Sequence, residues 1–323
     1  MSRILVTEPI PESGIELLST VGEVKIGDTG DYGNEENLLQ DISGFDALLC
    51  MLSTPVTSKV LEAASNLKIV ANFAVGYNNI DVSTAHKLNI KVANTPDVLT
   101  EACGDFAMGL LLALSRKFPQ AEQYLREGKF KGWEPLGFLG MELRGKTLGI
   151  IGMGRIGQSF AHRAKAFGMK IAYHNRSPLD KQTEKELDAV YFDDHFELAR
   201  KSDVLSLNCP LTDETFHLAD EQLLNQMPSH ALLINISRGA VVNEAALATA
   251  LHEKRIAGAG LDVFEKEPAV HPLLLSAPNT VLLPHIASAT FETRKAIGLL
   301  AARAIVAVLQ DKPDSEIPNL ITR

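Results

Sequence analysis

Short hydrophobic runs of strand length alternate with segments of helical spacing along almost the whole chain. In the first third, the apolar runs that we interpret as buried strands are residues 4–7, 24–26, 47–51, 69–73 and 91–93. Between these runs, the apolar positions recur with the period of a helix near residues 13–19, 35–42, 58–64 and 82–87. Strands that alternate with helices in this way predict a doubly wound parallel sheet.

The rest of the chain repeats this pattern. Its apolar runs of strand length are residues 148–151, 170–173, 204–207, 231–234, 258–261 and 281–283. One helix has a clear start, with Asn243 as N-cap, Glu244 in the first turn, and Leu247 and Leu251 on the inward face. The last segment, residues 291–309, has helical apolar spacing and no strand after it. The sequence therefore predicts a second α/β unit followed by a terminal helix.

A glycine-rich run, TLGIIGMGRIG, begins the second unit at Thr147. Its apolar half suits a buried strand, and Gly152, Gly154 and Gly157 follow at G-x-G-x-x-G spacing, with a helix expected from about Gln158. Such glycines permit a tight turn, close approach of the backbone to a pyrophosphate, and close packing of helix on strand. A strand before the glycines and a helix after them favour a dinucleotide site over a chance cluster. Almost half of the chain precedes this run, which predicts another folded unit upstream.

Composition and charge narrow the class of protein. The chain has 323 residues, 46% hydrophobic and 22% charged, which suggests two domains with separate cores. A net charge of -9 argues against a nucleic acid or an anionic membrane as partner. The N-terminus has no apolar leader, and the longest apolar run, residues 106–114, is too short to span a bilayer. We expect a cytoplasmic protein in which Cys50, Cys103 and Cys209 are reduced and buried.

Three polar residues follow strands of the second unit: Arg238, Glu267 and His285. Ligands of an open parallel sheet bind outside the carboxyl ends of its strands, so all three fall on the cofactor side. Together they suit hydride transfer to a 2-oxo acid. Arginine can bind the carboxylate and the carbonyl oxygen of the substrate together. Histidine can donate a proton near neutral pH, and a carboxylate beside the histidine favours its imidazolium form.

Each of these residues also has a plain structural interpretation. His285 is then a buried histidine satisfied by a backbone carbonyl, Glu267 a solvated loop charge, and Arg238 a surface residue at the start of a helix. Their joint occurrence after the glycine-rich run favours the catalytic interpretation. The other histidines show no metal-binding spacing, so we expect no metal site.

Several longer motifs support a family resemblance. They are NFAVGYNNID (72–81), VLTEA to GLLLA (98–113), the glycine-rich run, NCPLT (208–212), INISRG, GLDVFEKEP and LPHIAS. In these motifs, and over essentially its full length, the chain resembles the D-isomer-specific 2-hydroxy-acid dehydrogenases. The fold that this resemblance implies is α/β, with two doubly wound parallel-sheet domains. A Rossmann NAD(P)-binding domain, residues 100–285, is inserted in a flavodoxin-like substrate domain made of residues 1–99 and 286–323.

The resemblance also implies roles for individual residues. Arg238 and His285 bind the substrate, His285 is the acid/base and Glu267 is its partner. The backbone N–H groups of Val75 and Gly76 hold the substrate carboxylate, and Leu52 borders the substrate. The implied cofactor contacts, of which Thr100 and Asp262 line the nicotinamide, are Thr100, Gly152, Gly154, Arg155, Ile156, Gly157, Asn175, Arg176, Ser177, Cys209, Pro210, Thr215, Ile236 and Asp262. Members are usually homodimers joined through the cofactor domain and the helix near residues 106–115.

Local sequence narrows the expected activity. Formate dehydrogenases of this family carry Gln where Glu267 stands, which disfavours that activity. The stretch GWEPLGFLGMEL (132–143) and the sequence YHNRS (173–177) are most similar to glyoxylate/hydroxypyruvate reductases. We therefore expect reduction of a small 2-oxo acid to the D-2-hydroxy acid, with 2-ketogluconate reductase or a catalytically weak, NAD-sensing corepressor-like scaffold as alternatives. Trp133 either packs a domain corner or lines the active site of a neighbouring subunit.

The residues after strand 170–173 bear on the choice of cofactor. An NAD-specific site places Asp or Glu here to bind the ribose 2′-hydroxyl. This chain has Asn175, Arg176 and Ser177, so Arg176 can pair with a 2′-phosphate and Ser177 can donate to it. We expect NADP(H) to be preferred and NAD(H) to be possible. Alternatively, Asn175 binds the ribose of NAD and Arg176 contacts only solvent.

Overall fold

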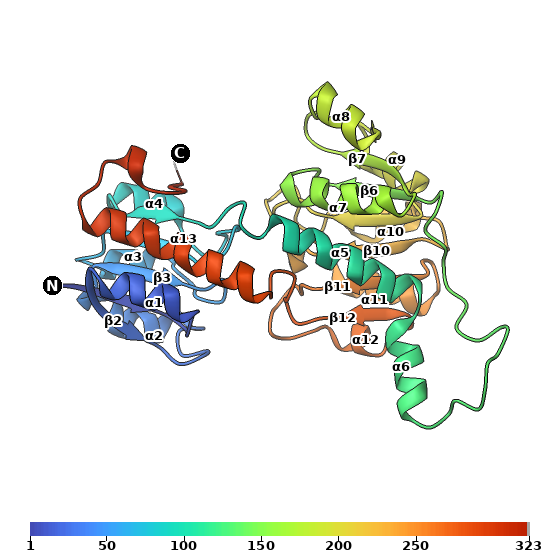
Figure 1. Ribbon diagram of the computed structural model, residues 1–323, viewed down its shortest axis with the longest axis horizontal. Coiled ribbons are helices and arrows are strands. Elements are labelled where there is room, and N and C mark those ends of the chain that lie inside the picture. Colours follow the sequence, from blue (N-terminus) through green and yellow to red (C-terminus); the bar gives the residue numbers. More distant parts are fainter. Residues whose placement is uncertain (322–323) are drawn as a thin grey trace. The chain divides into compact units, whose positions relative to one another are not determined.

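The computed structural model describes residues 1–321, which form two compact units (Figure 1). The first unit comprises Met1–Leu99 and Ala289–Arg323, and the second comprises Thr100–Ser288. The chain thus crosses between the units twice. The second crossing follows Ser288, three residues later than the predicted boundary after residue 285. Thr322 and Arg323, the end of the expected return segment, lie outside the described residues.

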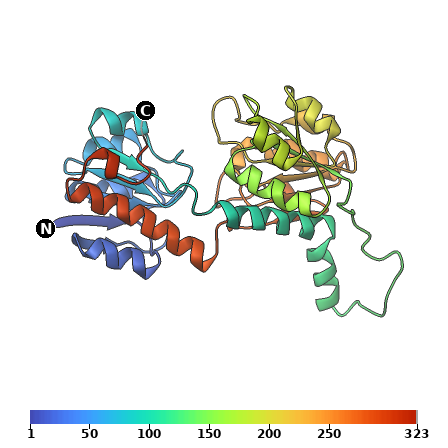
Figure 2. The same cartoon turned by 45° about the horizontal axis from the view of Figure 1, so that its top comes forward.

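The first unit contains, in its described part, a five-stranded parallel sheet of order β2-β1-β3-β4-β5. Its strands are β1 (Ser2–Val6), β2 (Gly22–Ile26), β3 (Ala47–Cys50), β4 (Ile69–Asn72) and β5 (Lys91–Ala93). Its helices are α1 (Glu12–Ser19), α2 (Glu35–Asp41), α3 (Ser58–Ala63), α4 (Val82–Lys87) and α13 (Phe291–Leu309). Figures 1 and 2 show α13 alongside α1, which completes this unit with the end of the chain.

The second unit contains, among residues 100–288, a seven-stranded parallel sheet of order β12-β11-β10-β9-β6-β7-β8. Its strands are β6 (Thr147–Ile151), β7 (Lys170–His174), β8 (Ala189–Tyr191), β9 (Val204–Leu207), β10 (Leu232–Asn235), β11 (Gly258–Leu261) and β12 (Thr280–Leu282). Its helices are α5 (Thr100–Ser115), α6 (Phe118–Arg126), α7 (Arg155–Ala166), α8 (Lys181–Leu187), α9 (His195–Lys201), α10 (Glu221–Gln226), α11 (Glu244–His252) and α12 (Pro272–Leu275). Both sheets are parallel, as the alternation of strands and helices predicts.

The sheet of the second unit has a hydrophobic core on each face. Successive side chains of a strand point to opposite faces, so Leu205 and Leu233 join one core, while Val204 and Leu232 join the other. The first core is closed by α9, α10 and α11, and the second by α5 and α7. Burial on both faces explains why these strands read as continuous apolar runs.

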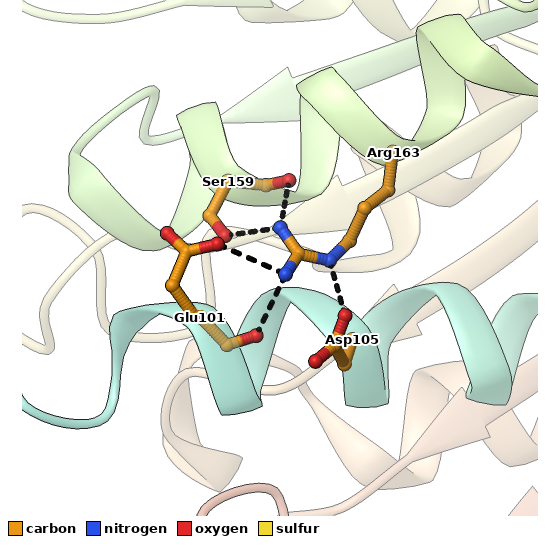
Figure 3. A network of polar contacts seen from close by, with 4 residues as sticks. All are labelled: Glu101, Asp105, Ser159 and Arg163. Atoms are coloured by element: carbon orange, nitrogen blue, oxygen red, sulfur yellow. Dashed lines mark hydrogen bonds and ion pairs between the residues drawn. The ribbon is translucent and has the colours of Figure 1, made fainter.

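The start of α5 is fixed on α7 by Arg163 (Figure 3). Its Nε donates to Asp105 Oδ1 (2.6 Å), and its Nη2 donates to Glu101 Oε2 (2.9 Å). Its Nη1 donates to the backbone oxygen and the hydroxyl of Ser159, at 2.9 and 2.7 Å. The guanidinium therefore joins the first turns of α5, where Thr100 lies, to the helix that follows the glycine-rich run.

One predicted helix start is confirmed and another is wrong. Asn243 accepts a hydrogen bond from Ala246 N at 3.0 Å, and Leu247 and Leu251 are buried, as predicted. The expected start of α7 near Gln158 is wrong, because the helix begins at Arg155, directly after Gly154. The strand β8 was missed because it is a three-residue edge strand without a buried residue. Within residues 1–321 no helix has the length and apolarity needed to cross a bilayer.

Candidate active site

The three candidate catalytic residues follow three neighbouring strands. Arg238 comes after β10, Glu267 lies in the loop after β11, and His285 follows β12. These strands are adjacent and parallel, so their carboxyl ends meet at one edge of the sheet. Residues that are 47 positions apart in sequence, from Arg238 to His285, are thereby gathered in one part of the second unit.

His285 and Glu267 form a hydrogen-bonded pair. The Nδ1 of His285 lies 2.9 Å from Glu267 Oε2, and the other carboxylate oxygen, Oε1, accepts from Phe264 N at 3.0 Å. The two side chains are 32% and 38% exposed. His285 is thus bound to a carboxylate and not to a backbone carbonyl, so the plain interpretation of this histidine is wrong. With Nδ1 engaged, Nε2 lies on the other edge of the ring, where it can exchange a proton with a bound molecule.

The carboxylate of Glu267 is stabilised in its ionised form. Burial acts to raise its pKa, but the hydrogen bond and charge of His285, the N–H of Phe264 and the charge of Arg238 outweigh burial and lower it. Because the pKa in the folded protein is depressed, the carboxylate keeps its charge at neutral and mildly acidic pH. Its contribution to the pair is lost only as the pH falls through that lowered pKa.

The backbone at His285 is held in an uncommon conformation. Its φ of 55° lies in the left-handed region, which residues with a side chain seldom adopt. Directly after it, the N–H groups of Ile286 and Ala287 both donate to the carboxylate of Asp262, at 2.8 Å each. Burial raises the pKa of Asp262, although these two N–H groups and the charge of His285 act against it. Asp262, a predicted nicotinamide contact, therefore anchors the backbone next to His285.

Arg238 has no ion-pair partner within residues 1–321, and its Nη1 donates to the carbonyl of the preceding residue, Ser237, at 2.7 Å. The buried Asn235 fixes the turn, because its amide donates to Arg238 O (2.9 Å) and its oxygen accepts from Ser237 N (3.0 Å). Burial lowers the pKa of Arg238, against the effect of Glu267. A half-buried guanidinium without a carboxylate partner suits an anionic ligand.

The glycine-rich loop after β6 fits a bound dinucleotide. Gly152 has φ +96°, and a Cβ there would lie 2.4 Å from Cys209 N. At Gly154 a Cβ would meet nothing within 4 Å, so its surroundings are open. No side chain caps the N-terminus of α7, which carries Arg155, Ile156 and Gly157 in its first turn. An open loop at an uncapped helix N-terminus is an anion site of the kind that holds a pyrophosphate.

Further predicted cofactor contacts lie on neighbouring strand ends. Asn175 follows β7, and its Oδ1 accepts from Met153 N at 2.7 Å, while Arg176 and Ser177 are exposed. In the loop after β9, Thr215 Oγ1 donates to Pro210 O at 2.7 Å, which braces the segment carrying Cys209. Ile236 lies at the end of β10, and Thr100 begins α5. Asn208 Nδ2 is buried in this region without a partner, as expected beside a site for a polar ligand.

The remaining predicted substrate residues, Leu52, Val75 and Gly76, belong to the first unit. Three asparagine side chains fix the turn that carries two of them. Asn72 Nδ2 donates to Gly76 O and Asn94 Nδ2 donates to Val75 O, at 2.7 Å each. Asn79 Nδ2 donates to Met51 O and Thr54 O, at 3.0 and 3.1 Å, which connects the turn to the segment around Leu52. Sequence reasoning missed this role, although two of these asparagines stand in the NFAVGYNNID motif.

The exposure of Trp133 and the burial of the cysteines test two predictions from the sequence. Trp133 is 84% exposed, so it does not pack a domain corner, and that alternative is wrong. Cys50, Cys103 and Cys209 are buried and form no disulfide bond, as predicted. Burial raises the pKa of Cys50 to about 12 and that of Cys209 to about 11, so both thiols stay protonated at neutral pH. Among the described residues, no group of three His, Cys, Asp or Glu side chains is arranged to hold a metal ion.

The fold and this site define a class: a two-unit α/β oxidoreductase with a nicotinamide-dinucleotide domain. The model of the D-isomer specific 2-hydroxyacid dehydrogenase, NAD binding domain, matches residues 108–287. The chain belongs to the D-isomer-specific 2-hydroxyacid dehydrogenase family, and it is an NAD(P)-dependent oxidoreductase.

Relatives resemble the chain over nearly its full length. It is 45% identical to a glyoxylate reductase of Thermococcus onnurineus, over 99% of this chain and 96% of that protein. It is 47% identical to a glyoxylate reductase of Pyrococcus furiosus, over 94% and 91%. Among solved structures, an NADPH-dependent glyoxylate/hydroxypyruvate reductase from Sinorhizobium meliloti, in complex with NADP and malonate, superposes with a TM-score of 0.86 at 39% identity, covering 100% of this chain and 99% of that one.

Proposed function

We propose that this protein reduces small 2-oxo acids, of the glyoxylate and hydroxypyruvate type, to D-2-hydroxy acids with NAD(P)H. The observation that carries this proposal is the gathering of Arg238, Glu267 and His285 at three adjacent strand ends. The full-length similarity to glyoxylate reductases supports the substrate class.

Each of the three residues has a distinct role in this proposal. Arg238 binds the carboxylate and the carbonyl oxygen of the substrate, and thereby orients and polarises the carbonyl group. His285 donates the proton from Nε2 to the carbonyl oxygen, while Glu267 at Nδ1 stabilises the imidazolium before transfer. The nicotinamide, when bound, supplies the hydride to the carbonyl carbon. Val75, Gly76 and Leu52 keep the substrate-binding roles that the family resemblance implies.

A substrate panel tests this function. We expect the highest kcat/KM for glyoxylate or hydroxypyruvate, measured by the absorbance change as NADPH is oxidised. A higher kcat/KM for 2-ketogluconate or for a branched-chain 2-oxo acid would replace the proposed substrate class. Absence of turnover on every 2-oxo acid, with NADPH still bound, would instead indicate a nucleotide-sensing scaffold.

We also propose that NADP(H) is preferred over NAD(H). Arg176 is exposed after β7, and its charge contributes to lowering the pKa of Glu214, so it is a cation at the surface that a 2′-phosphate can reach. No Asp or Glu occupies positions 175–177, so no negative charge there repels that phosphate. The anchored Asn175 holds the turn against the glycine-rich loop through Met153 N.

Asn175→Asp is expected to reverse this preference with little effect on the fold. Aspartate still accepts the hydrogen bond from Met153 N, but it adds a charge that repels the 2′-phosphate and accepts from a ribose 2′-hydroxyl. We expect kcat/KM for NADPH to fall by about 10-fold or more relative to NADH. Arg176→Ala should lower kcat/KM for NADPH while sparing NADH. Higher kcat/KM for NADH than for NADPH in the wild type would refute the proposed preference.

We further propose a homodimer joined through the second unit. The segment from α6 to residue 141 exposes large apolar side chains to solvent, with Trp133 at 84% and Leu136 at 80%. Its other exposed large apolar residues are Phe118, Leu125, Phe130, Phe138 and Leu139. Sedimentation equilibrium should give twice the chain mass at micromolar concentration, and Trp133→Arg with Leu136→Glu should shift the protein toward monomer. A wild-type monomer at that concentration would exclude this assembly.

A further inference from the structure

The turn that carries Glu267 is bound at both ends by one buried side chain. Lys266 and Ala269 form an isolated backbone bridge, with Ala269 N donating to Lys266 O at 2.9 Å, so Glu267 sits inside a tight turn. The carboxylate of Glu244, at the first position of α11, accepts from Glu265 N at 2.6 Å and from His271 N at 3.2 Å. These two donors flank Glu267 on either side. Glu244 therefore closes the loop that holds the partner of His285.

The placement of Glu244 is costly and needs a compensating interaction. The residue is only 5% exposed, and a buried carboxylate is tolerated only when hydrogen bonds satisfy it. Here both of its oxygens accept from the backbone of the 265–271 loop, so the hydrogen bonds that satisfy this buried carboxyl group come from the loop itself. Loss of one oxygen as an acceptor removes the hydrogen bond of Glu265 N or of His271 N to this side chain.

A second histidine–carboxylate pair, His217 and Glu265, is hydrogen-bonded to the backbone of Glu244. His217 Nε2 lies 2.9 Å from Glu265 Oε1, and the other oxygen of Glu265 accepts from Glu244 N at 3.5 Å. Glu244 and Glu265 thus exchange side-chain-to-backbone hydrogen bonds in both directions. Beneath them, Gly239 packs so closely that a Cβ there would lie 2.0 Å from Phe264 O. The segment just after Arg238 is thereby fixed against the loop of Glu267.

We propose that Glu244 is a positioning residue for the reaction, acting through the 265–271 loop to hold Glu267 at hydrogen-bonding distance from His285. The pair of His217 and Glu265 supports Glu244 in this role. The inference rests on the proposed function, because it assigns Glu244 to the efficiency of proton donation by His285. In this proposal Glu244 contacts neither the substrate nor the cofactor.

Glu244→Gln tests this role, because glutamine keeps the size of the side chain but offers one acceptor oxygen in place of two. We expect kcat for glyoxylate to fall by about 10-fold, as for a small displacement of a reacting group, with the dissociation constant of NADPH unchanged. Glu267→Gln removes the carboxylate charge beside His285, so we expect it to move the alkaline limit of reduction to lower pH. We expect Glu244→Gln to move this limit in the same direction. Combined with Glu267→Gln, Glu244→Gln should have little further effect, because both act through one contact.

Glu197→Gln is the matched control, since Glu197 also lies in the first turn of a helix of this unit but is exposed. It should leave kcat and the pH profile as in the wild type. If Glu244→Gln does not fold, His217→Gln should give a smaller shift in the same direction. An unshifted pH profile in the folded variant, or additivity with Glu267→Gln, would overturn the inference. An inactive wild type would instead contradict the proposed function.

Discussion

Replacing His285 by alanine is expected to lower kcat by roughly 10²- to 10⁴-fold, the usual contribution of a general acid. Glu267 would then have no proton donor to stabilise, and the carbonyl oxygen of the substrate would have no acid within reach. The dissociation constant of NADPH should change little, because the glycine-rich loop after β6 lies elsewhere on the sheet edge. Stopped-flow turnover and fluorescence titration of NADPH measure the two quantities.

A second variant separates chemistry from backbone strain. His285 has φ 55°, a region that alanine adopts at a cost but that asparagine tolerates well. His285→Asn should therefore preserve the thermal midpoint better than His285→Ala, with the same loss of kcat. A variant that keeps more than about a third of the wild-type kcat would remove His285 from the mechanism.

Arg238→Lys is expected to lower kcat/KM for glyoxylate by about 100-fold, although the charge is kept. The guanidinium offers two parallel N–H donors that can contact a carboxylate and a carbonyl oxygen together, whereas an ammonium group is a single point donor. Loss of one or two charge-assisted hydrogen bonds corresponds to about 1.5–3 kcal/mol each. Steady-state kinetics with glyoxylate, and with NADPH saturating, measure this change.

The matched variant for this position is Arg176→Lys, which alters an exposed arginine of the same unit that the proposal assigns to the cofactor. It should change KM for NADPH and leave kcat/KM for glyoxylate unchanged when NADPH is saturating. Kinetics within about threefold of the wild type in Arg238→Lys would mean that another group anchors the substrate.

The hydrophobic pattern predicted where the strands lie along the chain, except for β8, and that the sheets are parallel. Strands such as Val204–Leu207 and Gly258–Leu261 are buried throughout because helices cover both faces, and their mostly apolar runs are visible in the sequence. The edge strand Ala189–Tyr191 lacks this signal because it has no buried residue. The start of α7 was misplaced because its N-cap is Gly154, which contributes no side-chain oxygen.

The residues to which the proposal assigns ligand contacts were predicted from strand-end position and family motifs, but the hydrogen bonds that support them were not. Asp262 binds the backbone after His285, and Glu244 binds the loop around Glu267. Both act through backbone N–H groups that are distant in sequence, and a one-dimensional pattern carries no signal of such a contact. The asparagines that hold Val75 and Gly76 act in the same way.

The chirality of the product tests the central claim most directly. Hydroxypyruvate and NADPH, incubated with the wild-type protein, should give D-glycerate as the only enantiomer, as resolved by chiral chromatography. The same reaction with His285→Asn should give the same enantiomer far more slowly, because the proton donor is lost while Arg238 still orients the substrate. Formation of L-glycerate, of both enantiomers, or of no glycerate by the wild type would contradict the account.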